Sequence, residues 1–212
     1  MVLLPPWKLF SAALIISLAV ASEAPDATLP VQSLLDNANA LLAAGDKNGA
    51  LDHFDAVIKK DPHNYLTLFK RGATYLSLGR SSQASADFDS VLNLKPDFEA
   101  ALLQRARLKA KSGEWEAARA DYRRAGAAKH ADTIKEIDEA EEAAQEAYTA
   151  ADKEDWDTCV EKAGTAILVA QRKEPFRSLR AKCRLAKGDV VEAVGDLTYE
   201  PYPGNKTRET NN

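Results

Sequence analysis

Hydrophobic and small residues recur with a period of 34 positions between residues 31 and 130. Each unit carries a leucine, then a small residue four positions later, and in its second half an aromatic residue followed by another apolar or small one. The recurring sets are Leu34, Leu68 and Leu102; Ala38, Gly72 and Ala106; Phe54, Phe88 and Tyr122; and Val57, Val91 and Ala125. This pattern predicts two amphipathic helices in each unit, which cross closely where the small residue lies.

A glycine separates the two predicted helices of each unit, and other residues keep the same spacing around it. The recurring positions are Gly45, Gly79 and Gly113; Ala50, Ala84 and Ala118; and the unit-closing Pro62 and Pro96. A period of 34 with these residue types is typical of the tetratricopeptide repeat, a helix–turn–helix unit. The predicted fold is therefore an all-α solenoid, in which each unit packs on its neighbours and a long concave surface forms.

The register shifts after residue 130 and then resumes. The string Gly-Glu-Trp at 113–115 is echoed by Glu-Asp-Trp at 154–156, and the 34-residue spacing returns between Glu154 and Gly188. We therefore predict two further, degenerate repeats within residues 131–198.

The extra residues at the shift indicate how the repeats are connected. No Pro or Gly interrupts the run from Asp132, which can cap a helix start, to Asp152. We predict one elongated helix here, with a short helix plus a loop as the alternative. The chain is then about five repeats in two blocks, 31–130 and 131–198.

The N-terminal segment predicts a targeting signal. Residues 9–20 are apolar but too few to span a membrane, and Ala-Val-Ala at 19–21 fits a cleavage site. We predict a signal peptide over 1–21 and a polar leader over 22–30, with an uncleaved anchor as the alternative. After cleavage the chain should lie in the lumen of the endoplasmic reticulum, with no membrane contact.

The C-terminal residues 199–212 predict a loose tail, because two prolines and a glycine interrupt any helix. Asn205 begins the N-glycosylation sequence Asn-Lys-Thr within it. The sequence ends without a Lys-Asp-Glu-Leu retention signal, so it reads as the front part of a longer chain or as a shortened product.

Two cysteines, Cys159 and Cys183, fall on neighbouring predicted helices of the last two repeats. A disulfide between them is sterically conceivable and suits an oxidising lumen. Two buried free thiols are the alternative, because Cys159 occupies a position that favours a small side chain.

Charge and motif content argue against several function classes. The formal net charge is −4, and no basic stripe is interleaved with aromatic residues, which disfavours nucleic acid as a partner. The three histidines, His53, His63 and His130, have no partner at metal-ligand spacing. Because no phosphate loop or nucleophile motif occurs, we predict a protein that is not an enzyme and has no cofactor or metal. The acidic runs at 113–122 and 141–148 are predicted to be solvated helix faces.

The concave surface is the predicted binding site. Four positions of the first helix in each of the first three units should line it. The candidate contact residues are Leu35, Asn39, Leu42, Leu66, Phe69, Leu76, Leu103 and Arg107. An exposed apolar strip of this kind marks an interaction site. The alternative is that packing between adjacent helices hides much of it.

Some repeat proteins of this class hold acidic C-terminal tails through a clamp of Lys, Asn and Arg side chains, which supply charge-assisted donors. Only Asn39 matches that pattern here, and the other clamp positions hold Leu35, Lys70, Ala100 and Gln104. We predict that the clamp is absent and that the groove suits apolar segments.

Two stretches carry a resemblance to a known family. The segment from LLAAGDKNGALDHFDAVIKKDPHNY to EWEAARADY, together with LRAKCRLAKGDVVEAVGDL at 179–197, resembles the endoplasmic-reticulum co-chaperones with tetratricopeptide repeats and a C-terminal J domain, the fungal branch above all. The resemblance implies binding of unfolded client polypeptides and an indirect link to the chaperone BiP. The J-domain motif His-Pro-Asp is not present in this sequence. A plain scaffold that joins two folded partners is the alternative function.

Overall fold

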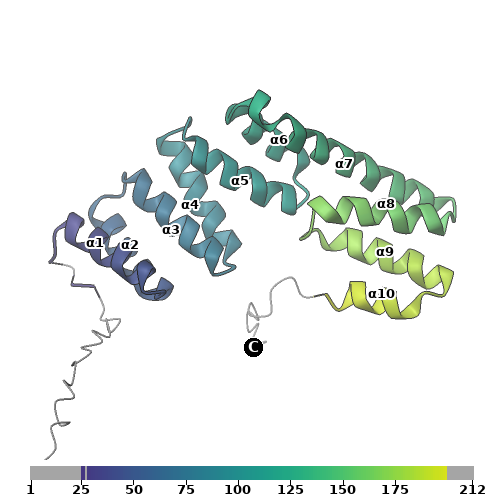
Figure 1. Cartoon of the computed structure of the whole chain (residues 1–212), viewed down its shortest axis with the longest axis horizontal. Coiled ribbons are helices and arrows are strands. Elements are labelled where there is room, and N and C mark those ends of the chain that lie inside the picture. The colour runs from purple at the N-terminus through teal and green to yellow at the C-terminus, as the bar shows by residue number, and fades with distance from the viewer. Residues whose placement is uncertain (1–24, 27, 200–212) are drawn as a thin grey trace, which may run out of the picture.

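The computed structural model describes residues 25, 26 and 28–199, and these fold into helices that stack in antiparallel pairs (Figure 1). The helices are α1 (Val31–Ala43), α2 (Lys47–Lys60), α3 (Tyr65–Ser77), α4 (Ser81–Leu94), α5 (Glu99–Lys111), α6 (Trp115–Arg124), α7 (Ala131–Asp152), α8 (Trp156–Val169), α9 (Glu174–Lys187) and α10 (Val190–Leu197), with a short 3-10 helix, η1 (Ala127–His130), before α7. The predicted all-α solenoid of tetratricopeptide repeats is confirmed.

The recurring glycines are needed by the turns between paired helices. Gly45, Gly79 and Gly113 have φ angles of 85°, 75° and 72°, in the left-handed region that glycine adopts without a steric penalty. In the fourth repeat the same turn is made by Glu154, with φ at 58°. The turn geometry is therefore kept there even though the residue type has changed.

Side chains at the recurring apolar positions form the core. Leu34, Phe54 and Phe88 are fully buried. A Cβ atom added at Gly72 would lie 2.9 Å from Cε1 of Phe88, closer than side-chain atoms pack. This contact explains why a small residue recurs where the two helices of a repeat cross.

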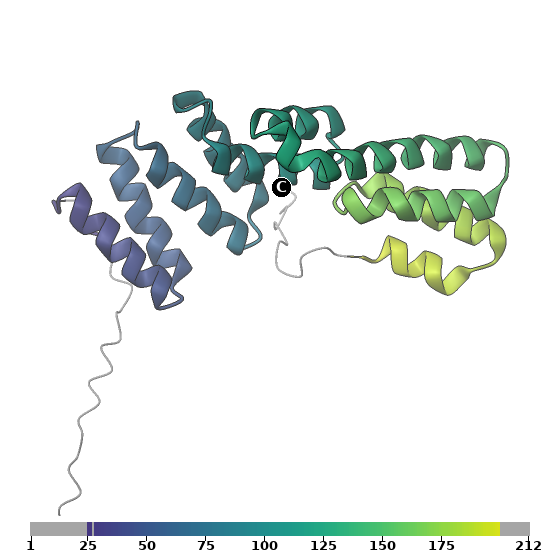
Figure 2. The same ribbon diagram turned by 45° about the horizontal axis from the view of Figure 1, so that its top comes forward.

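The long helix α7 connects the two blocks of repeats and runs beside α8 (Figures 1 and 2). It has 22 residues and begins at Ala131, directly after η1. Asp132 therefore does not cap it, as the sequence suggested, but lies in its first turn, where a negative charge interacts favourably with the helix dipole. The predicted elongated helix is present, and it starts two residues earlier than a cap at Asp132 would place it.

The two blocks share a hydrophobic core. Trp115 of α6 stacks on Phe176 of α9 with ring centroids 6.2 Å apart, and Ile137 of α7 is buried in the same cluster. The backbone N–H of Arg172, in the α8–α9 loop, donates to the carbonyl of Lys111 at 2.8 Å. These contacts make the solenoid continuous across the shift in register.

The last helix leaves an apolar face uncovered. Val190, Val191, Val194 and Leu197 of α10 are each at least half exposed. The predicted signal peptide over 1–21, residues 22–24 and 27 of the leader, the tail beyond Tyr199 and the candidate glycosylation site Asn205 lie outside the described residues.

Candidate functional site

The predicted groove residues lie side by side on α1, α3 and α5, the first helices of the first three repeats. Lys70 Nζ on α3 donates to Asn39 Oδ1 on α1 at 3.1 Å, which shows that the two faces are adjacent. Both of these side chains and Arg107 on α5 are exposed, so the groove has a polar component along its length.

The apolar part of the groove is less open than expected. Of the predicted apolar contact residues, only Leu66 has an exposed side chain, at 49%. The other predicted apolar contact residues, namely Leu35, Leu42, Phe69, Leu76 and Leu103, are half-buried and pack against the core clusters. Packing between adjacent helices therefore hides much of the strip.

Phe69 has a structural role in this packing. Its ring centroid lies 5.7 Å from that of Phe88 and 5.2 Å from that of Phe98, and Phe98 also contacts Tyr65 at 5.3 Å. Aromatic pairs at these distances stabilise beyond the area they bury. Leu66, one turn earlier on the same helix face, keeps about half of its side chain exposed to solvent.

Arg107 approaches a buried phenol at the end of the first block. Burial raises the pKa of Tyr122, and the nearby Arg107 charge opposes that shift. The Tyr122 ring lies 5.5 Å from the His130 imidazole of η1. Arg107 therefore sits beside the junction with α7, and is accessible from solvent.

Sequence reasoning missed a network of ion pairs inside the solenoid. Arg105 Nη2 lies 2.7 Å from Asp121 Oδ1, and the Asp121 side chain is only 3% exposed. Arg119 is also buried, and its Nη1 contacts Glu141 Oε2 at 2.6 Å. The prediction that the run at 113–122 is a solvated face is therefore wrong for Asp121 and Arg119.

A second pair shows that the network is periodic. Arg71, 34 residues before Arg105, binds Asp87, 34 residues before Asp121, at 2.6 Å. The hydrogen bond to Asp87, with a further one to Asp55, raises the pKa of Arg71 above its usual value. The 34-residue spacing of these charges was the signal that could have revealed the network.

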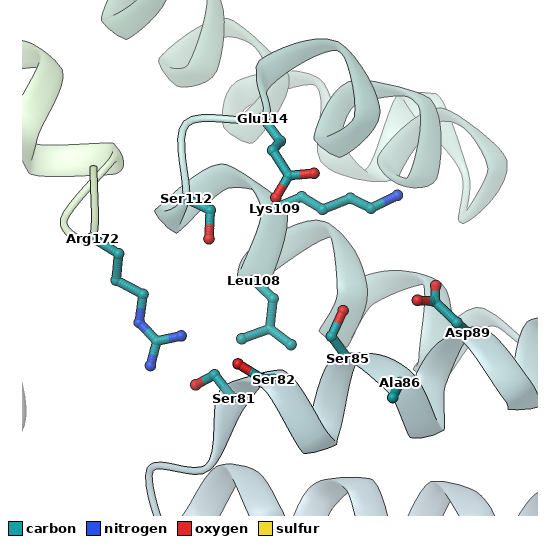
Figure 3. Close-up of a pocket in the computed structure, with 10 residues that line it drawn as sticks. All are labelled: Ser81, Ser82, Ser85, Ala86, Asp89, Leu108, Lys109, Ser112, Glu114 and Arg172. Atoms are coloured by element: carbon teal, nitrogen blue, oxygen red, sulfur yellow. The ribbon is translucent and has the colours of Figure 1, made fainter. Parts of the chain in front are cut away.

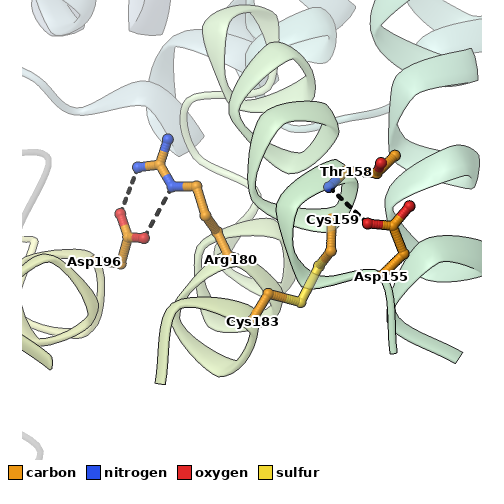
Figure 4. The surroundings of a disulfide bond; sticks show 6 residues. All are labelled: Asp155, Thr158, Cys159, Arg180, Cys183 and Asp196. Carbon is orange, nitrogen blue, oxygen red and sulfur yellow. Dashed lines mark hydrogen bonds and ion pairs between the residues drawn. A yellow bond between two sulfur atoms is a disulfide. The ribbon is translucent and has the colours of Figure 1, made fainter. Parts of the chain in front are cut away.

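The two cysteines form a disulfide between α8 and α9 (Figure 4). Their Cα atoms are 6.2 Å apart, and both side chains are fully buried among alanines of α7 and α8. The bond links the second helix of repeat four to the first helix of repeat five. It closes a sequence separation of 24 residues.

A polar hollow of about 400 Å³ lies at the junction of the two blocks (Figure 3). It is lined by Ser81, Ser82, Ser85, Ala86, Asp89, Leu108, Lys109, Ser112, Glu114 and Arg172. Lys109 Nζ already contacts Asp121 Oδ2 at 3.4 Å, and Figure 3 shows Arg172 extending toward the start of α4. We regard the hollow as part of the interface between the blocks and assign it no ligand.

The described residues provide neither a metal site nor a membrane-spanning helix. Within them, no group of three or more His, Cys, Asp or Glu side chains could hold a metal ion. Over the same residues, every helix is too short or too polar to cross a membrane.

The clamp positions give a prediction about acidic peptides. Lys70 is hydrogen-bonded to Asn39, and Leu35 is half-buried where the clamp needs a cation. A peptide ending in Glu-Glu-Val-Asp should therefore bind no more tightly than about 1 mM, equivalent to about 4 kcal/mol. Isothermal titration calorimetry measures this, and micromolar affinity that depends on the free C-terminal carboxylate would contradict it.

The fold, the 34-residue period and the turn glycines define a tetratricopeptide-repeat protein. No family model matches the chain. It is 51% identical over 173 residues to the tetratricopeptide repeat and J domain-containing co-chaperone DNJ1 of Fusarium oxysporum f. sp. lycopersici, a match that covers 82% of this chain and 33% of the relative. It is 31% identical over 175 residues to DnaJ homolog subfamily C member 3 of Gallus gallus, covering 79% of this chain and 35% of that protein.

A solved structure supports the same relationship. The crystal structure of the P58(IPK) TPR domain matches with a TM-score of 0.70 and 31% identity, covering 79% of this chain and 49% of that one. The chain belongs to the family of tetratricopeptide-repeat and J domain-containing co-chaperones, and it matches their repeat portion. It spans about one third of the length of the curated relatives. The relatives are co-chaperones, in agreement with the prediction that the chain is not an enzyme.

Proposed function

We propose that the chain is a client-binding repeat module of a co-chaperone in the lumen of the endoplasmic reticulum. In this role it binds unfolded polypeptide through the groove on α1, α3 and α5, and it is linked to BiP only indirectly. The proposal is supported by the match to the repeat portion of co-chaperones and by the apolar run at residues 9–20.

The observation that carries the proposal is the exposure of Leu66 in the middle of the groove. Leu66 is 49% exposed, and Phe69 and Leu103 form a half-buried apolar margin on the same block. The accessible apolar area is small, which suits weak and reversible contact with short apolar segments. Asn39, Lys70 and Arg107 provide polar groups that hydrogen-bond a bound backbone.

Replacing Leu66 with serine should weaken client binding about fivefold, because loss of half a leucine of buried area costs about 1 kcal/mol. The measurement is suppression of aggregation of a heat-denatured model protein over a range of module concentrations. Circular dichroism should show unchanged helicity, because Leu66 is not a core residue. Phe69 is unsuitable for this test because its aromatic contacts also stabilise the fold.

Leu168→Ser is the matched control. Leu168 is 74% exposed on α8, the second helix of its repeat and outside the groove. The control should suppress aggregation as well as the wild type does. Equal activity of Leu66→Ser and Leu168→Ser would reject the groove as the binding surface.

A scaffold that joins two folded partners is a second candidate, and the half-buried state of most of the strip favours it. If the wild-type module does not suppress aggregation at any concentration, client binding is rejected and the scaffold function is retained.

A further inference from the structure

An ion pair recurs at the same place in three of the helix pairs. With the turn residue counted as position 15 of its unit, position 7 on the first helix meets position 23 on the second, 16 residues later. The pairs are Arg71–Asp87, Arg105–Asp121 and Arg180–Asp196. In each pair the aspartate side chain is at most 5% exposed.

The fourth repeat has an ion pair at the same two positions with its charges reversed, and its side chains are more exposed, at 34% for Lys162 and 44% for Glu146. Glu146 of α7 is at position 7 and Lys162 of α8 is at position 23, and Lys162 Nζ lies 2.5 Å from Glu146 Oε2. In the first repeat the two positions hold Asn37 and His53, which do not combine a cation with a carboxylate. In repeats two to five, the first helix thus carries a charge opposite to that on the second helix of its own repeat.

The second helix of the fourth repeat also differs in its contact with the next repeat. Asp55 and Asp89, at position 25, reach forward to the arginine of the following repeat: Asp89 Oδ1 lies 2.7 Å from Arg105 Nη1. The residue at position 25 of α8 is Gly164, and a Cβ there would lie 3.5 Å from Arg180 Nη1. The aspartate that bridges forward to the next arginine in the first block is therefore replaced by glycine in α8.

We propose that the reversed polarity of the Glu146–Lys162 pair favours the pairing of α7 with α8 and disfavours their pairing with helices of other repeats. We call this reversed polarity the pairing code. Repeats have similar helices, so pairing between the wrong units, within one chain or between chains, is their characteristic folding error. Against α4 or α6, Glu146 would face a buried aspartate. Against α3 or α5, Lys162 would face an arginine. Like charges brought together out of water disfavour both wrong pairings.

The test is a double variant that keeps an ion pair but restores the common polarity, Glu146→Arg with Lys162→Asp. The full chain is unfolded in denaturant with reductant, refolded by dilution at several protein concentrations and examined by size-exclusion chromatography with light scattering. We expect the monomer to keep a thermal midpoint close to that of the wild type, because the pair is re-formed. The fraction of dimer and larger species after refolding should rise about threefold or more, because the code is lost.

The control Glu146→Asp with Lys162→Arg keeps the reversed polarity and should refold like the wild type. A second test variant, Glu146→Gln with Lys162→Gln, removes the code without adding a charge, so it covers the case in which the first variant does not fold. It should also raise the oligomer fraction above the control. If either folded test variant gives the oligomer fraction of the wild type, the pair only stabilises its repeat and the proposal is overturned.

Discussion

Replacing Asp121 with alanine is expected to lower the free energy of unfolding by about 3 kcal/mol, because the partly buried Arg105 guanidinium loses its buried partner and keeps only the exposed carboxylate of Asp89. The Asp121 side chain is 3% exposed and accepts two hydrogen bonds from Arg105, each at 2.7 Å. Lys109 contacts the same carboxylate. Urea denaturation followed by circular dichroism measures the loss.

The matched control is Asp89→Ala, which removes the other carboxylate bound to Arg105. Asp89 also lies 2.7 Å from that guanidinium, but its side chain is 52% exposed. An exposed pair contributes at most about 1 kcal/mol because water and salt screen it. If the two variants proved equally stable, burial would not be what gives Asp121 its importance.

Reduction of the Cys159–Cys183 disulfide is expected to destabilise the second block by about 3.5 kcal/mol, from the loop-closure entropy of a loop of this length. The bond joins α8 to α9, and α10 packs on α9 at the end of the stack. In a solenoid each unit depends on its neighbours, so the effect should concentrate near the broken link.

Hydrogen exchange with and without reductant measures this effect. Exchange should become faster from α8 onward in the reduced protein, and it should stay slow in α3–α6. A Cys159→Ala, Cys183→Ala variant is the control, because its exchange must not respond to reductant. Unchanged exchange of the wild type beyond Phe176 on reduction would contradict the expectation.

The repeat architecture could be predicted because the same residue types recur at fixed intervals. Gly72 and Phe88 illustrate this: one had to be small because the other packs on it. The openness of the groove could not be predicted, because the burial of Phe69 depends on how tightly adjacent repeats stack. A one-dimensional pattern identifies the face on which a residue lies but not how close the neighbouring helix comes.

The ion pairs were missed for a different reason. Charged residues at helical spacing usually form a solvated face, and Asp121 lies in an acidic run that fits that rule. Its burial follows from the crossing of α5 and α6, which brings Arg105 against it. Comparing the repeats for charge as well as for apolar residues would have shown the same Arg and Asp positions twice in the first block.

The turn before α8 stores conformational strain that the other turns avoid. Glu154 holds a left-handed backbone at φ 58°, which costs a residue with a side chain about 1–2 kcal/mol relative to the right-handed region. The disulfide begins five residues later, at Cys159. The fourth repeat thus combines an unfavourable turn with a covalent cross-link. The cross-link can offset the cost of the turn only while Cys159 and Cys183 remain joined as a disulfide. The stability of this repeat should therefore depend on the redox state of its surroundings.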